Sequence, residues 1–127
     1  MLSTKVLLVD DNPLVRSTMA KNLADEFAFS GVENDQQAWN KIHQWHPDII
    51  MLDVEMPGKN GYQLCDEFKQ SADSRDIPVL FISSRDSLRE RIQGYQVGAV
   101  DFLCKGCLLY TSPSPRDLST SRMPSSA

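Results

Sequence analysis

Short, almost entirely apolar runs recur along the first 105 residues, and helix-patterned or turn-forming sequence separates them. Two of these runs, at 6–9 and 49–52, stop abruptly at a carboxylate, Asp10 and Asp53. A short apolar run between turn formers is typical of a strand that is buried on both faces, as in a parallel sheet. We predict five such strands, which cover residues 5–10, 27–33, 48–53, 77–83 and 99–104.

Helical patterns lie between these strands. Asn12 can cap a first helix that has Pro13 at its first position and continues to about Glu26. We expect Asp35 to cap a second helix that ends before Pro47, and a loop at 57–61 to precede the third. The third helix is marked by Tyr62, Leu64, Cys65 and Phe68. The fourth is predicted to begin at a capping box at 87–90, to end at Gly98, and to turn inward the side chains of Leu88, Ile92 and Tyr95.

Alternating strands and helices predict an α/β fold with a doubly wound, five-stranded parallel sheet. Gly31 interrupts the second strand, which therefore suits an edge of the sheet. After residue 106 the character of the chain changes, because Ser, Thr and Pro dominate and apolar periodicity is absent. We expect one domain over 1–106 and a disordered, Ser/Pro-rich tail over 107–127.

Charge and composition exclude several classes of function. The chain has 127 residues, a net charge of −4 and a pI near 5.0, which argues against nucleic-acid binding by this domain. Its apolar runs are far shorter than the roughly 20 residues that span a bilayer. The first strand begins at about Lys5, which leaves no room for a signal peptide. We therefore expect a cytoplasmic location without membrane attachment.

Candidate chemistry gathers at the carboxyl ends of the predicted strands, where ligands of open α/β sheets bind. If the first and third strands are neighbours, Asp10, Asp11 and Asp53 meet there and repel one another unless a cation or proton intervenes. Carboxylates suit Mg²⁺, which often bridges to phosphate oxygens. The fourth and fifth strands end at Ser83 and Lys105, which could hold a tetrahedral dianion. We interpret the set as an aspartyl-phosphate site with Asp53 as nucleophile.

Residues 5–105 resemble the receiver domain of two-component response regulators, which has the CheY-like fold. Four motifs carry the resemblance: V-L-L-V-D-D, D-I-I-M-L-D-V-E-M-P-G-K-N-G, P-V-L-F-I-S-S and G-A-V-D-F-L-C-K. The resemblance implies a flavodoxin-like sheet with strand order 2-1-3-4-5. It also implies that the domain takes a phosphoryl group from a histidine kinase or phosphotransfer protein and catalyses only its own phosphorylation and dephosphorylation. A downstream protein or an attached effector domain would receive the signal.

Site roles follow from the same resemblance. Asp53 would be the phosphoacceptor, and Mg²⁺ would be held by Asp11, Asp53 and the backbone carbonyl of Glu55, with Asp10 acting through water. The Glu55 side chain is expected to influence hydrolysis of the phosphoryl group.

The resemblance also supplies a switch and a phosphate-binding group. Ser83 and Phe102 would be the switch residues, Ser84 the small residue beside the phosphate, and Lys105 the phosphate-binding lysine. Ser83 would move toward the phosphoryl group and Phe102 would turn inward, which alters the face formed by the fourth helix and fifth strand.

The chain departs from the family after Lys105. Gly106 stands where the family usually has proline, and no pattern for a fifth helix follows. We expect the fifth helix to be missing or replaced, the domain to be truncated after the fifth strand, and the tail over 107–127 to be foreign to the family.

Two other interpretations remain open. A pseudo-receiver would act through protein contacts alone and never take phosphate. A phosphatase of the haloacid dehalogenase type also uses a strand-end Asp and Mg²⁺, but expects D-x-D-x-[TV] at its first strand. Neither Asp10-Asp11-Asn12 nor Asp53-Val54-Glu55 fits that pattern.

Overall fold

The computed structural model describes residues 3–84 and 88–104 of the chain. This part contains five strands and four helices in strict alternation, as the sequence predicts. None of these helices is long and apolar enough to cross a membrane. The elements are β1 (Lys5–Val9), α1 (Pro13–Leu23), β2 (Ala28–Val32), α2 (Asp35–Trp45), β3 (Ile49–Asp53), α3 (Gly61–Gln70), β4 (Val79–Ser83), α4 (Leu88–Gln96) and β5 (Asp101–Cys104).

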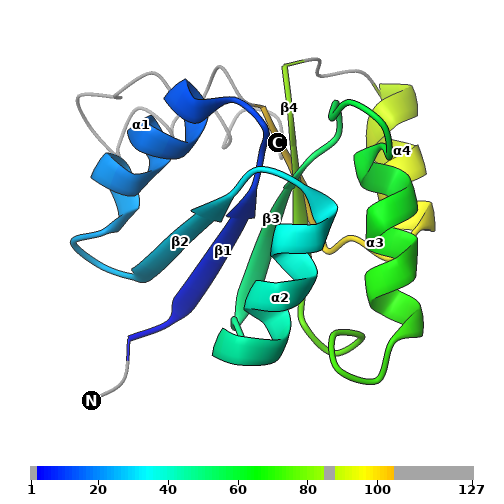
Figure 1. Cartoon of the computed structure of the whole chain (residues 1–127). Helices are drawn as coiled ribbons and strands as arrows, with labels where there is room; N and C mark the ends of the chain where they lie inside the picture. Colours follow the sequence, from blue (N-terminus) through cyan, green and yellow to red (C-terminus); the bar gives the residue numbers. More distant parts are fainter. Residues whose placement is uncertain (1–2, 85–87, 105–127) are drawn as a thin grey trace, which may run out of the picture.

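The strands form one parallel sheet in the order β2-β1-β3-β4-β5, which confirms the predicted fold class and strand order. Figure 1 shows α1 on one side of the sheet and α2, α3 and α4 on the other. This layering follows from right-handed crossovers, because β2 lies on one side of β1 and the later strands on the other. Gly31 lies in β2, which is an edge strand as predicted.

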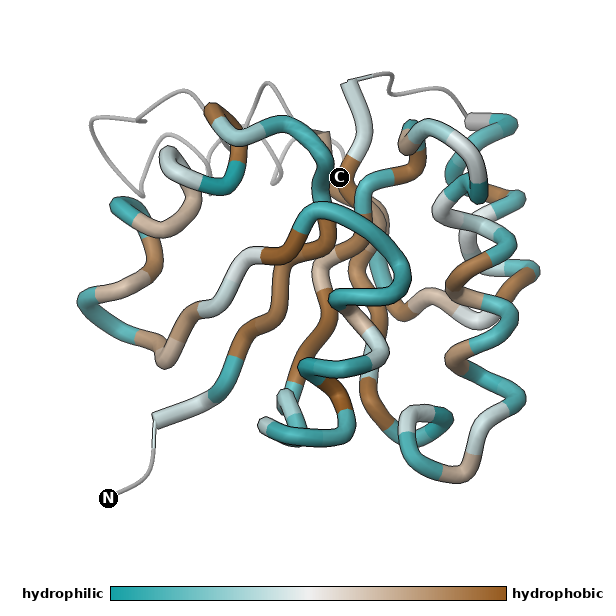
Figure 2. The backbone as a smooth tube through the Cα atoms, viewed as in Figure 1, coloured by the Kyte–Doolittle hydropathy of each residue, from teal (hydrophilic) through white to brown (hydrophobic). Residues whose placement is uncertain are grey.

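The central strands are buried on both faces, and Figure 2 shows them as predominantly hydrophobic stretches of the described residues. Alternate residues of β1 enter different cores: Leu7 and Val9 pack toward the side with three helices, whereas Val6 and Leu8 pack with Val15 of α1. The strands therefore need continuous apolar runs, because the side chains on each face of the sheet pack into a hydrophobic core.

Two helix starts differ from the prediction. The N-cap of α2 is Asn34 rather than Asp35, and its side chain accepts a hydrogen bond from the backbone N–H of Gln37. Asp35 is instead the first helical residue, where its charge interacts favourably with the helix dipole. Gly61, expected in a loop, is the first residue of α3, and Asn60 caps that helix.

The expected inner face of α4 is wrong at Ile92 and Tyr95, and the side chain of Leu88, its third predicted member, lies outside the described part of the structure. Ile92 and Tyr95 are each 47% exposed, whereas Gly94 is buried. A Cβ atom on Gly94 would lie 3.0 Å from the Phe81 ring and 3.3 Å from that of Phe102. The helix therefore approaches the sheet through a residue without a side chain, which rotates the larger apolar residues toward solvent. The expected cap at 87–90 begins outside the described residues.

An apolar groove of about 260 Å³ runs beside α1 on its face of the sheet. Its described lining is Val6, Met19, Asn22, Leu23, Phe27, Ile49, Met51, Leu80 and Leu103.

The expectations of a missing fifth helix and a foreign tail fall on residues outside the described part of the chain, and the domain boundary at residue 106 stays a prediction.

Cys65 of α3 is fully buried, and burial raises the pKa of its thiol to about 11 from an ordinary 9.0. We expect native Cys65 to react with iodoacetamide at pH 8 at least roughly 100-fold more slowly than the unfolded chain, because two pKa units cost that factor in thiolate. The rate should rise as the pH approaches 11. The measurement uses a Cys104→Ser/Cys107→Ser background, in which Cys65 is the only thiol. Equal native and unfolded rates would contradict the burial.

Candidate functional site

The sheet register brings the predicted acids together at the carboxyl edge. Val9 of β1 pairs with Leu52 of β3, so the next residues, Asp10 and Asp53, stand side by side. Asp11 follows in the β1–α1 loop, and oxygen atoms of all three carboxylates lie within 4.8 Å of one another. Asp10 and Asp53 are fully buried, whereas Asp11 is exposed to solvent. The structure thus places two acids inside the site and one at its mouth.

Local turns orient the two buried carboxylates. Asp10 Oδ1 accepts a hydrogen bond from the backbone N–H of Asn12 at 2.9 Å. In the same way, Asp53 Oδ1 accepts from the backbone N–H of Glu55 at 3.1 Å. A carboxylate that folds back onto the amide two residues later is a standard turn for Asp after a strand. Both turns place one carboxylate oxygen against backbone, and so fix the direction of each acid.

The next strand places Ser83 beside this cluster, and Phe102 lies on β5, two strands from Asp53. Asp53 pairs with Ile82, and buried Ser83 is one residue farther along β4. Phe102 of β5 pairs with Phe81 and is only 2% exposed, with ring centroids 6.2 Å apart. The ring of Phe102 is therefore inward in this structure, which is the orientation that the resemblance associates with the phosphorylated domain.

A side-chain hydrogen bond crosses the mouth of the site. Ser84 Oγ donates to Glu55 Oε1 at 2.7 Å, and so links the end of β4 to the β3–α3 loop. Nearby, the Tyr62 hydroxyl donates to the Glu90 carbonyl oxygen at 3.1 Å and joins α3 to α4. Burial raises the pKa of Tyr62, and the charges of Glu90 and Glu55 add to this effect, so the phenol stays a donor at neutral pH.

Lys105, the predicted phosphate-binding lysine, lies outside the described residues. Ser83 pairs with Cys104 at the end of β5, so the chain leaves the described part at the same sheet edge as the acids.

The donor set fits a small, hard divalent cation. Within the part of the chain that the structure describes, Asp10, Asp11 and Asp53 are the one group of metal-ligating side chains close enough to share an ion. All three offer carboxylate oxygens, the ligands that Mg²⁺ takes, and none offers the sulfur or nitrogen that zinc usually prefers. Their mutual repulsion at such short range also favours a bound cation.

Sequence reasoning missed two residues that support the site. Arg16 of α1 donates from Nη1 to the Asp10 carbonyl oxygen at 2.7 Å. Gly61 lies so close to β3 that a Cβ atom there would overlap the Asp53 carbonyl oxygen. The signals were present but weak: an arginine five residues after Asp11, and a glycine at a helix start.

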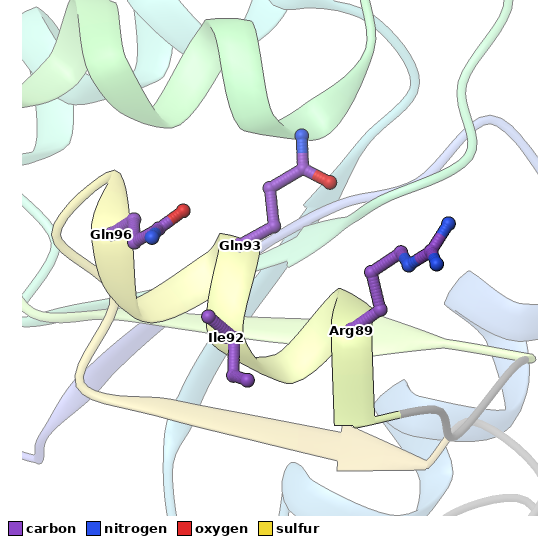
Figure 3. Close-up of a pocket in the computed structure, with 4 residues that line it drawn as sticks. All are labelled: Arg89, Ile92, Gln93 and Gln96. Atoms are coloured by element: carbon purple, nitrogen blue, oxygen red, sulfur yellow. The ribbon is translucent and has the colours of Figure 1, made fainter.

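The outer side of α4 forms a second surface, separate from the acids. Arg89, Ile92, Gln93 and Gln96 line a shallow depression there, and Figure 3 shows their side chains projecting from the helix. Tyr95 of the same helix is 47% exposed, and Val100, which directly precedes β5, is 57% exposed.

Comparison with known families and curated proteins gives one consistent answer. The family model described as the response regulator receiver domain matches residues 6–109. Response regulator PleD of Caulobacter vibrioides is 39% identical over 105 residues, which cover 82% of this chain and 23% of PleD. Response regulator Rre1 of Synechocystis is 35% identical over 102 residues, which cover 79% of this chain and 44% of Rre1. The chain thus spans less than half the length of these relatives.

Solved structures agree with the fold. The BeF3-activated N-terminal receiver domain of Klebsiella pneumoniae RstA has a TM-score of 0.70 and 28% identity, covering 94% of this chain and 96% of that one. The Vibrio cholerae chemotaxis protein CheY4 has a TM-score of 0.76 at 22% identity and covers 98% of both chains, a likeness that concerns the fold alone.

Proposed function

The chain belongs to the response regulator receiver domain family, and from this premise we propose that it is a phosphorylation switch with Asp53 as phosphoacceptor. The donor would be a phosphohistidine of a sensor kinase or phosphotransfer protein. The observation that carries the proposal is the cluster of three carboxylates within 4.8 Å at the carboxyl edge of the sheet. A capping role for these acids would not require two of them to be fully buried side by side.

In the proposed reaction, an Asp53 carboxylate oxygen attacks phosphorus, a P–O bond forms, and the P–N bond to the donor histidine breaks. The leaving nitrogen keeps the bonding electron pair. Asp11, Asp53 and the Glu55 carbonyl would hold Mg²⁺, with Asp10 acting through water, and the ion would supply positive charge against the phosphoryl oxygens. Ser83 and Lys105 would donate to the same oxygens. Buried surroundings strengthen each of these interactions.

The test is phosphoryl uptake by the 127-residue chain from acetyl phosphate, followed by intact-mass spectrometry. We expect one added phosphoryl group in the presence of Mg²⁺ and none when EDTA removes the ion. Uptake that is insensitive to EDTA would contradict the metal assignment. No uptake at all would favour a pseudo-receiver, and turnover of free phosphate esters would favour the phosphatase.

The output surface proposed from the resemblance is the face formed by α4 and β5. Phe102 lies beneath α4, against Gly94 of this helix, so a change at Ser83 or Phe102 has a short path to the outer side of the helix. The exposed side chains of Ile92, Tyr95 and Val100 supply apolar contacts for a downstream protein or an effector domain. In many protein switches, a local change in charge shifts a two-state element, and this shift alters an interface that a partner recognises.

Glu55→Ala is expected to slow loss of the phosphoryl group about fivefold, less than the roughly 100-fold of a complete general base. The reason is that the Glu55 carboxylate, held by Ser84 at 2.7 Å, can accept a hydrogen bond from the attacking water. Ser84→Ala keeps the Glu55 carboxylate but removes the hydrogen bond that orients it. It should therefore slow loss of the phosphoryl group as well, but by less than Glu55→Ala. The measurement is decay of the phosphorylated mass after removal of acetyl phosphate. Equal decay in Glu55→Ala and wild type would contradict the role.

A further inference from the structure

Arg16 ties α1 to the loop that carries two of the three acids. Its guanidinium Nη1 donates to the Asp10 carbonyl oxygen at 2.7 Å, and its backbone N–H donates to the Asn12 carbonyl oxygen at 3.2 Å. One residue therefore holds both ends of the three-residue segment 10–12. The guanidinium contact is short and charge-assisted, and such hydrogen bonds are roughly twice as strong as neutral ones.

Asp10 is fixed from other directions as well. Its backbone N–H donates to the Val32 carbonyl oxygen of β2 at 3.0 Å, and its Oδ1 accepts from the Asn12 amide. The Arg16 contact completes this set, because it holds the peptide group between Asp10 and Asp11. Rotation of that peptide group would change the direction of the exposed Asp11 carboxylate relative to the buried Asp53.

A glycine in the neighbouring edge strand makes room for Arg16. A Cβ atom on Gly31 would lie 3.2 Å from Arg16 Cδ and 3.4 Å from its Cβ and Cγ. The aliphatic part of the arginine thus lies over β2 at the one position without a side chain. This packing limits the conformations of the guanidinium group and directs it to the Asp10 carbonyl oxygen.

Charge and geometry make opposite demands on Arg16. A positive side chain bound next to an acidic site repels a second cation, so charge alone would make Arg16 weaken Mg²⁺ binding. Positioning has the opposite effect, because residues that orient metal ligands typically contribute 10–100-fold in affinity. The guanidinium group donates to the backbone carbonyl oxygen of Asp10. Through this contact it orients the loop and does not occupy the place of the cation between the carboxylates. This geometry favours positioning.

We propose that Arg16 is a positioning residue for the divalent-cation site, which it pre-forms by holding the Asp10–Asn12 segment against β2. The inference rests on the proposed function, since it concerns the Mg²⁺ site of that reaction. It adds an arginine–glycine pair, Arg16 and Gly31, to the residues on which the site depends.

Isothermal titration of the chain with MgCl₂ tests this inference without measuring phosphorylation. Arg16→Met keeps the packing over Gly31 but removes the donor and the charge, and we expect a Kd roughly 10-fold higher than wild type. Arg16→Lys restores a charged donor and should recover most of the affinity. Lys21→Met is the matched control, because it removes a positive charge from an exposed position of the same helix, and its Kd should match wild type.

Gly31→Ala approaches the same contact from the other side. Its added methyl group should displace the arginine chain and raise the Kd, and combining it with Arg16→Met should add little. Thermal unfolding in EDTA separates positioning from stability. In each of these variants, the loss of Mg²⁺-binding free energy should exceed any loss of unfolding free energy. An Arg16→Met chain that binds Mg²⁺ as tightly as wild type, or more tightly, would overturn the inference alone. A wild-type chain that binds no Mg²⁺ would overturn it together with the proposed function.

Discussion

Asp53→Asn is expected to abolish phosphoryl uptake from acetyl phosphate, the largest effect that any single substitution in this chain should have. The carboxamide has nearly the shape of the carboxylate, so the buried position at the end of β3 can accept it without a cavity. It lacks the anionic oxygen that attacks phosphorus. Intact-mass spectrometry in the presence of Mg²⁺ should show no added phosphoryl group.

The matched control is Asp25→Asn, the same change at an exposed acid after α1, at the opposite edge of the sheet. It should leave uptake unchanged. Asp53→Asn should also keep its cooperative unfolding transition, and in EDTA the variant should be at least as stable as wild type. The reason is that one of three repelling carboxylates has become neutral. Undiminished uptake by Asp53→Asn would show that the phosphoryl group is carried elsewhere.

Most of this site could be predicted because it lies where strands end. The apolar run of β3 stops at Asp53, and the run of β1 stops at Asp10, so the parallel register alone brings the two acids together. Ser83 follows the same logic at the end of β4. Strand periodicity is a strong signal, and the carboxyl edge of a parallel sheet is a fixed place. The fold class was therefore accessible from the pattern of strands and helices, whereas the strand order came from the resemblance to the receiver-domain family.

Residues that act by close approach were not accessible in the same way. Ile92 and Tyr95 have helical spacing and large apolar side chains, so they resemble an inner face. The structure instead turns Gly94 inward, because the rings of Phe81 and Phe102 already fill the space under α4. Hydrophobic patterning depends on apolar side chains. It therefore cannot identify a glycine such as Gly94, which lets the helix approach the sheet because it has no side chain.

Arg16 illustrates a second limit. A charged residue near the start of a surface helix is usually solvated, and its spacing from Asp11 does not reveal a contact with a carbonyl oxygen. The contact depends on Gly31, fifteen positions away in the edge strand. Pairs of this kind become visible only when the helix and the strand are placed together.

Gly61→Ala should be the most damaging conservative change outside the acids. A Cβ atom there would overlap the Asp53 carbonyl oxygen and would lie 2.9 Å from Val54 Cα and 3.0 Å from the Asp53 carbonyl carbon. All three contacts are with backbone, so no side chain can rotate away to relieve them. Overpacking of this kind typically costs about 1–3 kcal/mol, and we expect a value near the upper end.

Gly58→Ala provides the control that separates crowding from backbone strain. Gly58 has φ of +82° and nothing within 4 Å of an added Cβ, so alanine there is strained but not crowded. It should cost about 1–2 kcal/mol in unfolding free energy, the price of a left-handed conformation for a residue with a Cβ. Urea unfolding in EDTA should therefore rank wild type, Gly58→Ala and Gly61→Ala in order of decreasing stability.

The functional consequence of Gly61→Ala should exceed what its stability loss implies. The backbone that must move is that of Asp53 itself, and a displacement of about 1 Å at a reacting group can cost on the order of 100-fold in rate. Below the unfolding transition, where Gly61→Ala is still folded, its initial rate of phosphoryl uptake should fall at least tenfold, and by more than that of Gly58→Ala. Equal rates in the two alanine variants would show that α3 can shift without moving Asp53, and that the close contact between Gly61 and β3 serves packing alone.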